Sequence, residues 1–62
     1  MKLYIIFYNK PNLVISIEKD NYSMFLKELC NLLSNKDFIL LEDDNKTVYA
    51  LRTNEIEMLY IK

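Results

Sequence analysis

The 62-residue chain contains no glycine, histidine or tryptophan, and it has only one cysteine and one proline. The absence of glycine excludes the Walker and Rossmann phosphate-binding loops, because both need glycine where the backbone approaches phosphate. Without histidine, the usual general base near neutral pH is missing. A single cysteine rules out an internal disulfide, and too few Cys and His ligands remain for a structural zinc site. We therefore expect no cofactor, no metal and no enzymatic activity.

The chain also lacks long blocks of charge. Its net charge is −1, and its eight lysine and arginine residues are spread along the sequence. No basic block is available to follow a phosphate backbone, which makes nucleic acid or an anionic membrane an unfavourable partner. The N-terminal apolar run is too short for a secretory or transmembrane segment. With its unpaired cysteine, the sequence therefore predicts a complete cytoplasmic chain without a targeting segment.

The most informative segment that is present is Leu3–Tyr8, six consecutive apolar residues of which half are aromatic. A strand with one solvated face would alternate apolar and polar residues, and this one does not. The segment therefore predicts a central strand over residues 2–8 that needs cover on both faces.

The rest of the chain indicates one helix among further strands. Asn9–Asn12 is a turn signal and residues 13–18 alternate, so residues 2–18 predict a hairpin. Apolar residues recur every three or four positions over 21–34, which predicts an amphipathic helix. We expect Asp20 to be its N-cap and Asn35 to be a left-handed C-terminal residue.

The C-terminal half predicts three more strands. Phe38–Glu42 is nearly continuous in apolar residues and predicts a strand buried on both faces. A polar reversal follows, in which Asn45 is expected to take a positive φ, and residues 47–52 are rich in β-formers. After a tight turn at Thr53–Asn54, residues 55–61 fit a strand better than a helix, although Ile56, Leu59 and Tyr60 also have helical spacing.

These elements predict a single α+β domain over residues 1–62, with the order ββαβββ and one helix packed on one face of a small antiparallel sheet. One helix cannot cover both faces of such a sheet. Either the sheet curls into a barrel-like core or its far face is buried against another molecule. Domains of this size are marginally stable alone, which favours a partner, including a second copy of the chain as a dimer or larger oligomer.

Tyrosine supplies a large apolar surface with a polar tip and is favoured at interfaces. We therefore expect the even positions of Leu3–Tyr8 to face the partner, with acidic and basic residues at the rim. The predicted partner-binding residues are Tyr4, Tyr8, Tyr49, Tyr60, Glu42, Asp43, Asp44 and Arg52.

Two other motifs are weaker. Asp43 and Asn45 match two ligand positions of a calcium loop, but the required glycine and the distal glutamate are missing. Cys30 is expected to be a small residue at or near the core.

No motif in the sequence identifies a family. Its composition is rich in isoleucine, leucine, lysine, asparagine and tyrosine, which is typical of AT-rich genomes. A reading frame of 62 residues without a catalytic group is common among phage, virus and mobile-element products. The predicted function is that of a non-enzymatic, self-associating protein-interaction module that binds and modulates a host protein. The alternative is a small nucleic-acid-binding regulator that stacks bases on aromatic residues of a sheet face.

Overall fold

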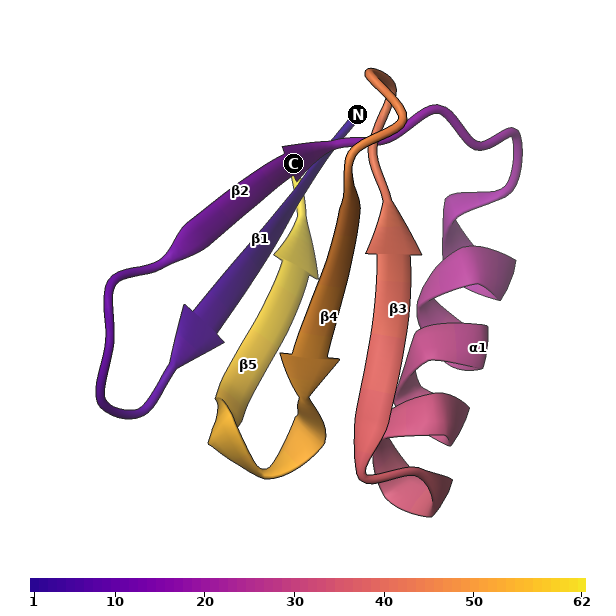
Figure 1. Cartoon of the computed structure of the whole chain (residues 1–62). Coiled ribbons are helices and arrows are strands. Elements are labelled where there is room, and N and C mark those ends of the chain that lie inside the picture. Colours follow the sequence, from indigo (N-terminus) through magenta and orange to yellow (C-terminus); the bar gives the residue numbers. More distant parts are fainter.

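The computed structural model describes all 62 residues and has five strands and one α-helix in the order ββαβββ (Figure 1). The α+β class and the order of the elements are confirmed, and residues 55–61 do end in a strand rather than a helix. Thr53–Glu55 forms a short 3-10 turn before that strand. The elements are β1 (Lys2–Phe7), β2 (Leu13–Ser16), α1 (Tyr22–Asn35), β3 (Phe38–Glu42), β4 (Val48–Arg52) and β5 (Ile56–Ile61).

The strands form two antiparallel sheets instead of one continuous sheet. Sheet A has the order β2-β1-β5, so β1 is central as predicted, and sheet B is the hairpin β3-β4. The 3-10 turn separates β4 from β5, and β5 pairs with β1 at the start of the chain. The two termini consequently lie side by side, and Lys2 and Lys62 exchange backbone hydrogen bonds of 3.1 and 2.9 Å (Figure 1).

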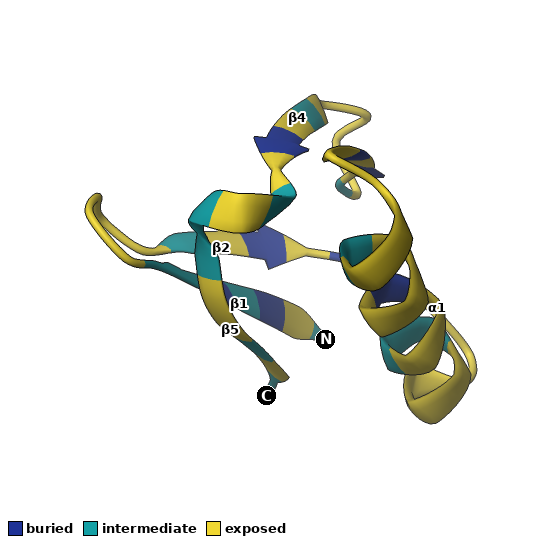
Figure 2. Cartoon of the chain, turned by 90° about the horizontal axis from the view of Figure 1, so that it is seen from below, coloured by how far each residue is buried: buried dark blue, intermediate teal, exposed yellow.

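The core lies between the two sheets and the helix. Figure 2 shows sheet A, the hairpin and α1 surrounding one interior. The two sheets therefore cover each other, which leaves less for the helix to cover than a single flat sheet would. The buried residues are all apolar: Leu3, Ile5, Ile15, Ile17, Leu29, Ile39, Leu41 and Leu51.

A bulge in the pairing of β1 with β5 adjusts which side chains face this core. The register shifts between Ile6 and Phe7, so Ile6 pairs with Met58 whereas Phe7 pairs with Ile56. An extra residue in one strand changes the facing of the residues beyond it. Ile56 therefore packs against the core together with Leu59 and Ile61, while Met58 and Tyr60 face outward.

The helix covers residues 22–35, close to the predicted 21–34, but its caps differ from the prediction. Asn21, not Asp20, is the N-cap, and its side-chain oxygen accepts a hydrogen bond of 3.0 Å from the backbone N–H of Met24. Asn35 is the last helical residue, and Lys36 follows it in an extended conformation (φ −126°). The amide of Asn35 instead donates to the carbonyl and side-chain oxygens of Asn31, both at 2.9 Å.

Three further expectations are corrected. β3 alternates, with Ile39 and Leu41 buried and Phe38 and Leu40 exposed, so it is not buried on both faces. The residue with positive φ in the following turn is Lys46 (φ 65°), not Asn45. Cys30 is exposed, because it is rotated by about 100° around α1 from the buried Leu29.

Candidate interaction surface

The outer face of the hairpin β3-β4 is the most exposed apolar surface of the chain. The strand register places Phe38 opposite Arg52, Leu40 opposite Ala50 and Glu42 opposite Val48 on this face. Leu40 is 69% exposed, Val48 58% and Phe38 56%. Their partners on the other face, such as Ile39 and Leu51, fill the core. We call the six residues of the outer face, Phe38, Leu40, Glu42, Val48, Ala50 and Arg52, the hairpin face.

The hairpin face carries one charge of each sign at opposite corners. Glu42 ends β3 and Arg52 ends β4, so they are separated by about 13 Å along the strands and about 5 Å across them. Neither side chain takes part in an ion pair within the chain, whose one salt bridge joins Lys10 and Glu55. The Arg52 guanidinium lies over the Phe38 ring, 5.2 Å from its centroid. The face is thus apolar in its middle and charged at two ends.

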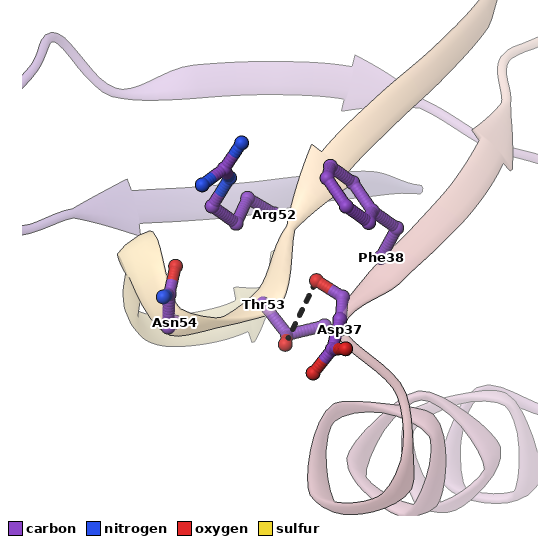
Figure 3. Close-up of a pocket in the computed structure, with 5 residues that line it drawn as sticks. All are labelled: Asp37, Phe38, Arg52, Thr53 and Asn54. Atoms are coloured by element: carbon purple, nitrogen blue, oxygen red, sulfur yellow. Dashed lines mark hydrogen bonds between the residues drawn. The ribbon is translucent and has the colours of Figure 1, made fainter.

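A small cavity lies at the Arg52 end of the hairpin face (Figure 3). The Thr53 hydroxyl closes one side of it by donating to the backbone carbonyls of Lys36 (2.7 Å) and Asp37 (3.2 Å). Its volume is about 220 Å³, below the roughly 300–1,000 Å³ of typical small-molecule sites. Its size is better suited to a single side chain of a partner than to a whole ligand.

The outer face of sheet A is a second apolar surface, and it contains two of the predicted tyrosines. Tyr4 and Tyr60 are paired across β1 and β5, and their rings stack with centroids 4.8 Å apart and an interplanar angle of 1°. Val14 and Met58 extend this face and are exposed. The stack covers one face of each ring, so part of the apolar surface of the two tyrosines is removed from solvent without a partner.

A groove of about 430 Å³ separates the first turns of α1 from the unpaired edge of β5. Its walls are largely apolar and carry no charged side chain. It is lined by Tyr22, Ser23, Leu26, Leu59, Tyr60 and Ile61.

Asp43, one of the predicted rim charges, stabilises the β3-β4 turn. Its Oδ1 atom accepts hydrogen bonds of 2.9 Å from the backbone N–H groups of Asn45 and Thr47, and its Oδ2 atom accepts one of 3.0 Å from the Tyr49 hydroxyl. These bonds, the one from Thr47 first, hold the pKa of Asp43 below its ordinary value of 3.8. The same contact raises the pKa of Tyr49, because its hydroxyl donates to the carboxylate. The calcium-like spacing of Asp43 and Asn45 is therefore explained by a turn that satisfies its own backbone.

The acid sensitivity of folding should depend on Asp43. Because its pKa is lower in the folded than in the unfolded chain, its contribution to stability is fully present above the ordinary pKa of 3.8 and is lost as the pH falls through the folded-state value. We expect Asp43→Asn to flatten the loss of stability in this acidic range. Thermal unfolding followed by circular dichroism from neutral to strongly acidic pH measures the effect. Asp44→Asn is the matched control, because the neighbouring carboxylate of Asp44 makes no hydrogen bond; equal acid profiles for the two variants would contradict the assignment.

The eight residues predicted to bind a partner do not form one surface. Glu42 and Arg52 lie on the hairpin face, and Tyr4 and Tyr60 lie on the outer face of sheet A. Tyr49 packs against the core from the inner side of β4, and Asp43 and Asp44 belong to the turn. Tyr8 is exposed beyond the end of β1, where its backbone N–H donates to the carbonyl of Glu55 at 3.1 Å.

Sequence reasoning missed the most exposed members of the hairpin face. The unbroken apolar run Phe38–Glu42 predicts a strand covered on both sides, which places Phe38 and Leu40 inside, and no role in binding is predicted for Val48. The signal that could have found them is the small number of elements in the chain. The outer face of a two-stranded hairpin stays exposed unless another element covers it.

No family model matches the sequence, and no curated protein matches it. Nor is any helix of the structure long and apolar enough to cross a membrane, α1 being 14 residues long.

Proposed function

We propose that this chain is a non-enzymatic protein-interaction module that binds a protein partner through the hairpin face. The observation that carries the proposal is the exposure of Phe38, Leu40 and Val48 side by side on a two-stranded sheet. Exposed apolar residues are common singly, whereas a contiguous group rimmed by polar residues marks a binding surface. Glu42 and Arg52 supply such a rim.

The proposal also extends to the biological setting expected from the short chain and its lack of a catalytic group. As a phage or mobile-element product in the cytoplasm, the module would modulate a host protein by covering a surface of that protein. Small size and an apolar face with few charges support this proposal, because such a face can block a site on another protein without catalytic residues.

The alternative of a nucleic-acid-binding regulator has less support. Single-strand binders place aromatic side chains in a positively charged groove. Here the aromatic pair Tyr4 and Tyr60 is stacked on itself, and its flanking lysines, Lys2 and Lys62, lie in a chain of net charge −1.

A lysine in the middle of the hairpin face should abolish binding. We expect Leu40→Lys to fold as the wild type does, because Leu40 is exposed, but to lose partner binding because a partner would have to desolvate the ammonium group. The measurement is retention on two surfaces, an immobilised wild-type chain and a displayed library of random peptides.

Met24→Lys is the matched control, since Met24 is also exposed but lies on α1. It should bind as the wild type does on whichever surface retains the wild type. If all three chains behave alike on both surfaces, the hairpin face is not a binding site and the proposed function is wrong.

A further inference from the structure

We infer that the partner of the hairpin face is a second copy of this chain, packed face to face with the two hairpins running in opposite directions. The inference rests on the proposed function and names its partner. It is carried by the complementary charges on the hairpin face and by the exposed apolar residues between them.

The charges are arranged for self-recognition. Arg52 and Glu42 lie at diagonal corners of the same face, and neither is paired within the chain. A two-fold axis in the plane of the interface and across the strands reverses one hairpin relative to the other. Arg52 of each copy then lies over Val48 of the other copy, whose cross-strand neighbour is Glu42, and the long Arg52 side chain reaches diagonally to that carboxylate, so the symmetry forms two opposite-charge contacts.

The apolar middle fits the same arrangement. Face-to-face sheets pack about 10 Å apart with their strands within about 30° of each other. In the reversed orientation the row of Leu40 and Ala50 lies over the same row of the partner, since it is midway between the charged ends. The other simple orientation, with the two-fold axis along the strands, would place Arg52 over Phe38 and Glu42 over Val48 and form no charge pair.

The size of the face sets the strength of the dimer. A two-stranded sheet of five-residue strands is about 17 Å long and about 10 Å wide, smaller than the roughly 800 Å² per partner of a standard interface. The dimer should therefore be weak, with a dissociation constant that is micromolar or higher, and sedimentation should be followed from micromolar to millimolar concentrations.

Charge reversal tests the geometry. In Glu42→Arg, each of the two contacts becomes Arg against Arg, and in Arg52→Glu each becomes Glu against Glu. We expect each variant alone to dimerise about tenfold more weakly than the wild type, because two exposed attractive pairs become repulsive. A mixture of the two variants should form a heterodimer of about wild-type affinity, since every contact is again between opposite charges.

The double variant E42R/R52E should also recover the wild-type affinity, which separates the charge effect from the loss of the Arg52–Phe38 contact. Sedimentation equilibrium measures the affinities, and circular dichroism checks that each variant is folded. If the mixture stays as weak as its components while Leu40→Lys still abolishes binding, the proposed function holds and the face-to-face reversed dimer is wrong. A wild type that remains monomeric at every concentration overturns the second copy as the partner, and the displayed peptides then decide whether the hairpin face binds at all.

Discussion

Replacing Leu29 with alanine is expected to remove a large part of the stability of the fold. Leu29 is 2% exposed and is the one buried residue of α1. Leu→Ala changes in protein cores cost about 2.7–5 kcal/mol, whereas a domain of this size has a total stability of only about 3–9 kcal/mol. A helix of 14 residues is marginal in water without its tertiary contacts. Losing the Leu29 contact therefore threatens both the helix and the core that it closes.

Urea unfolding followed by circular dichroism measures this effect, and the same helix offers a matched control. Leu32 is 37% exposed, so Leu32→Ala removes the same atoms and changes helix propensity equally but should cost only about 1 kcal/mol, since only part of its apolar surface is buried. Leu29→Met keeps the volume and should remain folded, with a cost below about 1.5 kcal/mol. Equal stabilities for Leu29→Ala and Leu32→Ala would show that α1 is not anchored through Leu29.

Proline at position 58 should destabilise the fold strongly, whereas proline at position 14 should not. Both residues lie on the outer face of sheet A with similar exposure, 50% for Met58 and 45% for Val14. They differ in where their backbone N–H groups point. Reciprocal bonds between Lys2 and Lys62 mark a hydrogen-bonded pair, and such pairs alternate along an antiparallel ladder, so Met58 lies in a hydrogen-bonded pair with Ile6.

On the other side of β1, the backbone N–H of Ile17 donates to the carbonyl of Met1, so these two residues form a hydrogen-bonded pair. Because hydrogen-bonded and non-hydrogen-bonded pairs alternate, Val14 lies in a non-hydrogen-bonded pair, and its N–H points to the free edge of β2. Met58→Pro therefore removes a ladder bond and leaves the Ile6 carbonyl unpaired, a cost of about 2–4 kcal/mol. Val14→Pro removes no ladder bond and should cost about 1 kcal/mol or less, because proline is tolerated on edge strands.

The denaturant midpoints of the two proline variants test whether β5 pairs with β1 in this register. The pairing β2-β1-β5 requires Met58→Pro to be the less stable by a clear margin. Similar midpoints, or the reverse order, would mean that β5 is not paired with β1 in this register.

Local patterns in the sequence predict most of the secondary structure. The alternation of residues 13–18, the apolar stripe of residues 21–34 and the run Leu3–Phe7 each depend on neighbours within a few positions. The inner residues Leu3, Ile5, Ile15 and Leu29 follow from the same patterns. Caps and turn residues were less predictable, because Asp20 and Asn21, or Asn45 and Lys46, differ by one position and compete for the same role.

The candidate interaction surface was only partly predictable for a physical reason. Glu42 and Arg52 could be assigned to a rim, because charged residues at strand ends remain in solvent. Whether Tyr49 or Leu40 faces the core depends on which side of the hairpin the other sheet covers, and that is a long-range contact. The sequence predicted Tyr49 outside and Leu40 inside, and the structure has the reverse.

By itself, the sequence determined the α+β class, the order ββαβββ and an excess of apolar residues over what one helix can cover, because composition and periodicity are local properties. Only the tertiary structure decided how that excess is distributed. The turn at Thr53–Glu55 directs β5 to β1, which splits the strands into two sheets that cover each other's inner faces. Covering the inner faces leaves the outer sides of both sheets in solvent, and Leu3–Tyr8 is therefore buried on one side while its tyrosine at position 4 stacks on Tyr60.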